Sequence, residues 1–176
     1  MNIVLIGYRG TGKSTVAKLL AQRLGYEAVS TDAEIVRREG ATIPEIVQRY
    51  GWEPFRDRES EVCRDLGARD RLVIDTGGGA ILREENVRAL KASGVLVWLT
   101  AEVKTIARRI GGDDQRPSLT GTKSFVDEIE EVLQQRLPKY QAAADQVIRT
   151  DELTPDEIAD RVIAAVQSAA DRAPVQ

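Results

Sequence analysis

Residues 7–14 read G-Y-R-G-T-G-K-S, and this segment constrains the fold more than any other part of the chain. It fits the phosphate-binding pattern G-x-x-x-x-G-K-[ST] and lies between the apolar residues 3–6 and a helical pattern that begins at Val16. Glycines permit the tight turn in which backbone N–H groups face phosphate oxygens, and the following helix adds the positive end of its dipole. A merely structural turn would not explain why Lys13 and Ser14 follow at the fixed spacing. The loop therefore predicts a site for a nucleoside triphosphate.

The side chains of this loop predict how the nucleotide is held. Lys13 is expected to reach the β- and γ-phosphates, and the Ser14 hydroxyl is expected to coordinate Mg²⁺ directly. We therefore expect ATP as co-substrate and Mg²⁺ as cofactor. The loop residues assigned to nucleotide binding are Gly10, Thr11, Gly12, Lys13, Ser14 and Thr15.

The size and charge of the chain limit its classes of function. With 176 residues it can form one domain with a substantial core. Its 25 basic and 28 acidic residues give a net charge of −3, which creates no overall field that favours nucleic acid or an anionic membrane. No segment reads as a signal peptide or a membrane span, and the single cysteine, Cys63, suits a reducing compartment. We expect a cytoplasmic protein without nucleic-acid or membrane partners, and a monomer because no surplus apolar helix face stands out.

Short apolar runs alternate with helical patterns along the whole chain. Strands are expected at residues 3–6, 28–30, 72–74, 95–99 and 146–148. Helices are expected at residues 13–24, 32–38, 43–66 with a possible break at Pro54, 84–92, 102–109, 125–142 and 155–170. This alternation predicts an α/β fold of the P-loop NTPase type, with three α/β/α layers and a five-stranded parallel sheet. We expect a single domain over residues 1–170, a mobile lid at about 111–124 and a frayed tail at 171–176.

Ligands of open parallel sheets bind beyond the carboxyl ends of the strands. Asp32 follows the second strand, where it can cap a helix, contact the substrate, or do both. Because the chain has no histidine, a carboxylate is the natural general base. Asp75 ends the third strand, which is the position of a carboxylate that holds magnesium-bound water, although a simple turn aspartate also fits. Gly77, Gly78 and Gly79 follow, and they indicate either close approach of a group to the backbone or a flexible turn.

Several arginines are candidates for binding an anion. Arg136 falls on the apolar stripe of its helix and therefore needs an anionic partner, which is either a structural carboxylate or a ligand. Arg56 precedes Glu59 by three residues, which is the spacing of an intrahelical pair. Arg116 lies in the expected lid, where it either reaches the transferring phosphate on closure or remains solvated. Arg109, in the last turn of a helix, either balances the helix dipole or lies beside the nucleotide.

Taken in order, these residues resemble those of the shikimate kinases, from Asn2 to about Ala165. Beyond the phosphate loop, the likeness consists of Asp32, Phe55-Arg56 with Glu59, Gly77-Gly78-Gly79, Arg116-Pro117 and Arg136-Leu137-Pro138-Lys139-Tyr140. The resemblance implies transfer of the γ-phosphate of ATP to the 3-hydroxyl of shikimate, a step of chorismate and aromatic amino acid biosynthesis. A kinase of gluconate or of a nucleoside monophosphate, and an ATP-hydrolysing switch without an acceptor, are the alternatives.

The resemblance also implies a role for each matching residue. Asp32 would bind the ring hydroxyls near the attacking oxygen, while Arg56 and Arg136 would hold the shikimate carboxylate. The backbone of Gly78 and Gly79 would lie beside that carboxylate, and Gly77 would belong to the same substrate site. Phe55, Glu59 and Pro117 would surround the ring. Lys13 and Arg116 would stabilise the moving phosphoryl group, and Arg109 and Pro155 would flank adenine. The implied catalytic residues are Lys13, Asp32 and Arg116.

The chain departs from the family at the end of the second strand. Family members often read Asp-x-Asp there, with the first aspartate contacting magnesium through water, whereas this chain reads Ser30-Thr31-Asp32. Serine cannot supply the missing charge. Our hypothesis is that Asp75, at the end of the neighbouring strand, takes over this outer-shell role.

Overall fold

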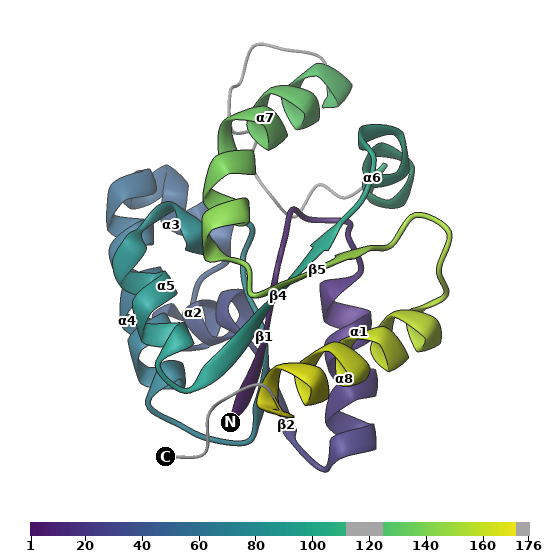
Figure 1. Cartoon of the computed structure of the whole chain (residues 1–176). Helices are drawn as coiled ribbons and strands as arrows, with labels where there is room; N and C mark the ends of the chain where they lie inside the picture. The colour runs from purple at the N-terminus through teal and green to yellow at the C-terminus, as the bar shows by residue number, and fades with distance from the viewer. Residues whose placement is uncertain (112–124, 172–176) are drawn as a thin grey trace.

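The computed structural model describes residues 1–111 and 125–171, which form a parallel sheet covered by helices on both faces (Figure 1). The sheet has the strand order β2-β3-β1-β4-β5, and every neighbouring pair is parallel. The strands are β1 (Asn2–Ile6), β2 (Glu27–Ser30), β3 (Leu72–Asp75), β4 (Gly94–Thr100) and β5 (Gln146–Arg149). The predicted five-stranded parallel sheet is therefore confirmed.

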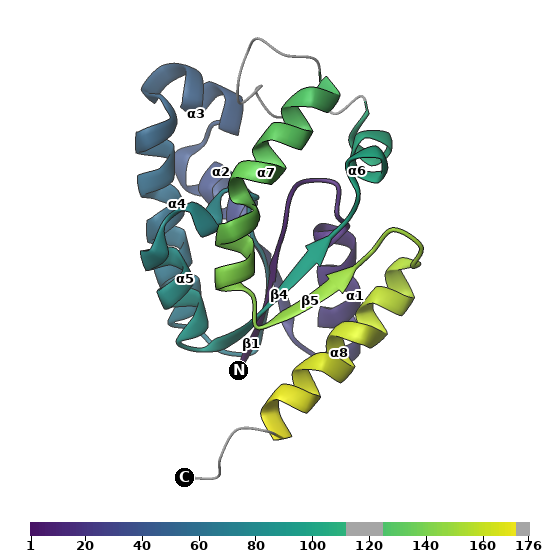
Figure 2. The ribbon, with the colours of Figure 1, turned by 45° about the horizontal axis from the view of Figure 1, so that its top comes forward.

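The helices form the two outer layers. They are α1 (Lys13–Leu24), α2 (Thr31–Glu39), α3 (Ile43–Tyr50), α4 (Trp52–Gly67), the 3₁₀ turn η1 (Ala80–Leu82), α5 (Glu84–Lys91), α6 (Val103–Ile110), α7 (Phe125–Ala143) and α8 (Pro155–Asp171). In Figures 1 and 2, α1 and α8 cover one face of the sheet, while α2 to α5 and the end of α7 cover the other. The molecule thus has the predicted α/β/α layers.

Residues 3–6 of the central strand β1 are continuously apolar because both faces of the sheet are covered. Ile3 and Leu5 pack against α1 and α8, whereas Val4 and Ile6 belong to the core under α4 and α5. Alternate side chains of a strand point to opposite faces, so a strand that is covered on both sides needs no polar positions. The strand therefore delivers the loop that follows it from a rigid position.

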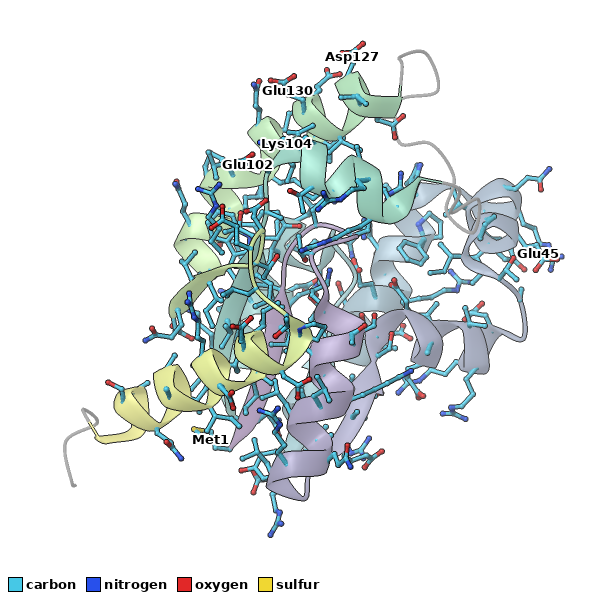
Figure 3. The ribbon with its side chains drawn as sticks, turned by 90° about the vertical axis from the view of Figure 1, so that its right-hand side faces the viewer. Met1, Glu45, Glu102, Lys104, Asp127 and Glu130 are labelled. Atoms are coloured by element: carbon cyan, nitrogen blue, oxygen red, sulfur yellow. The ribbon has the colours of Figure 1, made fainter. Side chains whose placement is uncertain are left out.

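The carboxyl ends of the strands lie at one end of the molecule. Met1 marks the opposite end, while Asp127 and Glu130, near the start of α7, rise beyond the strand ends (Figure 3). The phosphate loop, the start of α2 and the glycines after β3 all follow strand ends. The topology therefore gathers the predicted functional segments at this end, as expected for an open parallel sheet.

The expected helix over residues 43–66 is two helices, and its break lies at Gly51 rather than at Pro54. Gly51 has φ 87° and ψ 176°, a combination that is essentially restricted to glycine. Pro54 lies in the first turn of α4, where its missing N–H removes no helical hydrogen bond. The prediction placed the break at the wrong residue because proline breaks a helix only in its interior.

The capping reading of Asp32 is also wrong. Ser30 is the N-cap of α2, and its Oγ accepts a hydrogen bond from the backbone N–H of Ala33 at 3.3 Å. Asp32 lies in the first turn, where a negative charge suits the helix dipole. Ser30 and Asp32 are both residue types that cap helices, and the backbone geometry makes Ser30 the N-cap.

The ends of two other predicted segments can be compared only in part. Helix α8 continues through Asp171, which the sequence placed in the frayed tail, and residues 172–176 lie outside the described residues. Of the predicted lid, Gly111 alone is described. Within the described residues, no helix is both long and apolar enough to cross a membrane.

Candidate active site

The phosphate loop turns tightly between β1 and α1. Positive φ values occur at Gly7 (145°), Gly10 (78°) and Gly12 (94°). The Lys13 ammonium donates hydrogen bonds to the backbone oxygens of Gly7 at 2.8 Å and Tyr8 at 2.9 Å. Lys13 is only 7% exposed, so its charge lies against the loop instead of extending into solvent. This places a cation at the turn where the phosphates were predicted to bind.

Ser14 and Asp75 meet across the end of the sheet. The Ser14 hydroxyl donates to Oδ2 of Asp75 at 2.5 Å, and Ser30 is the register partner of Asp75 on the adjacent strand. Among the described residues no cluster of three or more His, Cys, Asp or Glu could hold a metal by itself. A hydroxyl beside one carboxylate does fit Mg²⁺, which takes oxygen ligands and usually keeps waters and substrate phosphates in its shell.

A cavity lies beside the phosphate loop. Its lining residues are Tyr8, Arg9, Asp32, Ile43, Trp52, Phe55, Arg56, Glu59, Gly77, Gly78, Gly79 and Arg136. The structure thus brings together the residues that the sequence assigned to the acceptor, apart from Pro117, which lies outside the described residues. They come from α2, α4, α7 and the turn after β3, which are far apart in the chain.

The glycines after β3 make room for side chains of the protein itself. A Cβ atom on Gly77 would lie 2.6 Å from Oδ1 of Asp32 and 3.0 Å from Oε1 of Glu59. A Cβ atom on Gly79 would lie 2.3 Å from both terminal nitrogens of Arg56. The Gly77 N–H also donates to the Thr31 hydroxyl at 2.9 Å, which fixes the turn to the start of α2. The predicted close approach is therefore made by charged side chains.

Arg56 and Glu59 form the predicted intrahelical pair, but inside the cavity wall. Arg56 Nη1 donates to Oε2 of Glu59 at 2.6 Å, and the Glu59 residue is 0% exposed. The guanidinium also lies over the rings of Trp52, at 5.4 Å, and Phe55, at 5.2 Å. Burial raises the pKa of Glu59, although the Arg56 charge opposes this shift. The pair holds Arg56 against an aromatic wall, where its remaining donors are available to a ligand.

Arg136 lines the same cavity from α7. It is buried and interacts with the hydroxyl of Tyr140, which donates to the backbone oxygen of Gly78 at 2.6 Å. Burial raises the pKa of Tyr140 to about 12, with the Arg136 charge opposing the rise. Tyr140 stacks on Trp98 with ring centres 5.4 Å apart. This packing fixes Arg136 beside the glycine turn, and its burial confirms the inward position that the helix stripe predicted.

Arg109 connects the phosphate loop to the loop after β5. Its Nη1 donates to the Gly10 oxygen at 3.2 Å, and its Nη2 donates to the Thr150 oxygen at 3.0 Å. Pro155 begins α8 and is exposed. The contact of either residue with adenine remains a prediction. Arg116 and Pro117 lie outside the described residues.

Sequence reasoning missed four cavity residues, namely Tyr8, Arg9, Ile43 and Trp52. Trp52 carried a signal, because it precedes Phe55 by three residues and therefore shares its helical face; their ring centres lie 5.8 Å apart. Tyr8 and Arg9 occupy unrestricted positions of the loop pattern. Ile43 reads as an ordinary core residue.

The strand order, the phosphate loop and the adjoining polar cavity define a phosphotransferase of the P-loop class. A family model described as shikimate kinase matches residues 9–167. The chain therefore belongs to the shikimate kinase family, as the sequence predicted.

Individual relatives agree with this assignment. A shikimate kinase of Nitratidesulfovibrio vulgaris is 46% identical over 152 residues, which cover 85% of this chain and 86% of the relative. A shikimate kinase of Syntrophus aciditrophicus is 43% identical and covers 95% of this chain and 91% of its own. Among solved structures, shikimate kinase from Acinetobacter baumannii in complex with shikimate has a TM-score of 0.91 at 36% identity, covering 96% of this chain and 93% of that one.

One more distant solved structure is a kinase of gluconate, which the sequence left open as an alternative acceptor. This gluconokinase from Sinorhizobium meliloti has a TM-score of 0.57 at 18% identity. At that identity it shares the fold alone.

Proposed function

We propose that the protein transfers the γ-phosphate of ATP to the 3-hydroxyl of shikimate, which yields shikimate 3-phosphate and ADP for chorismate biosynthesis. The observation that carries this proposal is the cavity in which Asp32, Arg56 and Arg136 meet beside the phosphate loop. Two guanidinium groups and a carboxylate suit an acceptor that bears a carboxylate and several hydroxyls. Family membership supports the same acceptor.

The proposed acceptor pose follows from the charges in the cavity. Arg56 and Arg136 bind the carboxylate of shikimate, since each is held by neighbouring side chains in the cavity wall. Asp32 binds the ring hydroxyls and accepts the proton of the 3-hydroxyl as the phosphoryl group transfers. Phe55 and Trp52 provide an apolar surface for the ring.

Phosphoryl transfer depends on positioning and charge neutralisation more than on covalent chemistry. The Lys13 ammonium exchanges its bonds to the loop oxygens for the γ-phosphate and stabilises the charge of the transferring group. Ser14 would hold Mg²⁺ directly and Asp75 would hold it through water, and the bound ion would neutralise phosphate oxygens. Arg116 is assigned to the phosphates by its likeness to the family alone. A monomer in the cytoplasm completes the proposal.

Product analysis tests this reaction. Incubation with ATP, Mg²⁺ and shikimate should give ADP together with a phosphate ester whose ³¹P signal couples to the proton on carbon 3. Without shikimate, ADP release should fall to the background of slow hydrolysis. ADP release at the same rate with and without shikimate would instead indicate a nucleotide switch.

Gly79 is expected to be essential for acceptor affinity because it leaves space for Arg56. Replacement by alanine should raise KM for shikimate about 10- to 100-fold, since the new Cβ displaces the guanidinium from the cavity wall. The backbone at Gly79 (φ −97°, ψ 0°) accepts alanine without strain. Gly78→Ala is the matched control, because its Cβ would lie an ordinary 3.4 Å from Arg136. Steady-state kinetics at saturating ATP that give equal KM values for both variants would contradict this role.

Asp75 is expected to matter for the metal and not for the acceptor. Asp75→Asn keeps an oxygen for the Ser14 hydroxyl but removes the charge, so the Mg²⁺ concentration for half-maximal rate should rise roughly tenfold. KM for shikimate should stay within about twofold. Adding Ser30→Asp should recover part of the Mg²⁺ affinity, because Ser30 pairs with Asp75 across adjacent strands. An unchanged magnesium titration in Asp75→Asn would reject the outer-shell role.

A further inference from the structure

The Tyr8 side chain lies where α6, α7 and the acceptor cavity come together. Its ring belongs to one buried apolar cluster with Ile106 and Ile110 of α6 and with Ile129 and Val132 of α7. It also lines the acceptor cavity, and the residue is only 2% exposed. Tyr8 therefore lies between the acceptor cavity and helices α6 and α7, which precede and follow residues 112–124 in the sequence.

The backbone of Tyr8 belongs to the nucleotide site. Its carbonyl oxygen accepts hydrogen bonds from Nζ of Lys13 at 2.9 Å and from the Thr11 hydroxyl at 2.8 Å. The main chain at this position is thus fixed by two side chains of the phosphate loop. A ligand that binds the Tyr8 side chain would bind a residue whose carbonyl already positions Lys13.

The hydroxyl of Tyr8 is buried and has no hydrogen-bond partner among the described residues. Buried tyrosine hydroxyls normally find a partner, because burial removes their water. Tyr140, which stands near the same cavity wall, shows the ordinary case by donating to the Gly78 oxygen. Oε1 of Glu59, another residue of the cavity lining, is likewise buried without a partner in the described part of the chain. One cavity therefore contains two polar atoms that lack partners, one of which can donate.

The neighbours of Tyr8 on α7 indicate where its hydroxyl lies. Tyr8 clusters with Val132, and Arg136 follows Val132 by four residues on the same face of that helix, so Tyr8 and Arg136 line the same part of the cavity. Arg136 is the group that we assign to the acceptor carboxylate. A donor beside Arg136 would therefore lie closer to the acceptor carboxylate than to the ring hydroxyls.

We propose that the Tyr8 hydroxyl donates a hydrogen bond to the carboxylate of the hydroxylated acid in the cavity, as a third acceptor-binding group beside Arg56 and Arg136. The assignment rests on the proposed function. It gives Tyr8 a defined place in the site, with its side chain on the acceptor and its backbone oxygen on Lys13. The same residue then transmits acceptor binding to the phosphate loop.

Calorimetric titration of the full chain with shikimate tests this assignment. Tyr8→Phe should raise the Kd for shikimate about tenfold, because one hydrogen bond to a charged group is lost. The Kd for ADP in the absence of shikimate should stay within about twofold. The Tm of the ligand-free variant should not fall, since the deleted hydroxyl has no partner to lose.

Tyr140→Phe is the matched control for stability. It deletes a hydroxyl that already has a partner, so the ligand-free Tm should fall by about 2 to 4 °C. An unchanged shikimate Kd in Tyr8→Phe would overturn the assignment. A drop in its ligand-free Tm equal to that of Tyr140→Phe would do so as well, because it would mean that the hydroxyl is already paired. If the wild-type protein itself fails to bind shikimate, the proposed function is wrong and this assignment falls with it.

Discussion

Replacing Lys13 with methionine is expected to lower kcat for shikimate phosphorylation by about a thousandfold. Methionine keeps most of the side-chain volume but removes the only charge of the residue, which lies against the phosphate loop. That charge neutralises the transferring phosphoryl group, so its loss should act mainly on kcat. KM for shikimate should change little, because the acceptor cavity is lined by other residues.

The Lys13 variant needs a lysine control on the same helix. Lys18→Met serves, since Lys18 is exposed on α1. Its kcat should equal that of the wild type within about twofold. Rapid-quench or coupled assays of ADP formation measure both variants, and a Lys13→Met enzyme with more than a tenth of wild-type kcat would contradict the assigned role.

Asp32→Asn is expected to lower kcat by roughly 10²- to 10⁴-fold, which is the usual range for loss of a general base. Asparagine still binds ring hydroxyls but cannot accept their proton, and the chain has no histidine to replace it. KM for shikimate should therefore change much less than kcat. The effect should appear at saturating concentrations of both substrates.

Glu34→Gln is the matched control for Asp32→Asn, because Glu34 lies on the same helix and pairs with Arg37 and Arg38 at the surface. Its turnover should equal that of the wild type. If Asp32→Asn keeps nearly full turnover, Asp32 only orients the acceptor and leaves the list of catalytic residues.

The sequence was sufficient for the parts of the site that depend on local rules. The loop pattern predicted a strand, a turn and a helix, and the positive φ angles of Gly10 and Gly12 show why those positions are glycine. The inward stripe of α7 predicted a buried Arg136, and the 3-residue spacing predicted the pair of Arg56 and Glu59. Topology then followed from the alternation of strands and helices, since parallel strands place their carboxyl ends together.

The remaining features depend on packing between distant segments. Ile43 and Tyr8 line the cavity only because α3 and the phosphate loop meet there, and neither residue differs in type from many core positions. The glycine turn was predicted to allow a group to approach its backbone closely, and only the packing shows that the tightest neighbours are Asp32 and Arg56. Ser30 shows the same limit. Both Ser30 and Asp32 are residue types that cap helices, and only the backbone angles show that Ser30 is the N-cap of α2.

The most direct test of the proposed acceptor site is the rate of ADP release with shikimate, gluconate, AMP, CMP and water supplied in turn. With Asp32, Arg56 and Arg136 in one cavity, kcat/KM for shikimate should exceed that for every other acceptor by at least about a thousandfold, or roughly 4 kcal/mol. Water alone should give no more than background. A higher kcat/KM with gluconate, AMP or CMP than with shikimate would show that the cavity was assigned to the wrong phosphoryl acceptor.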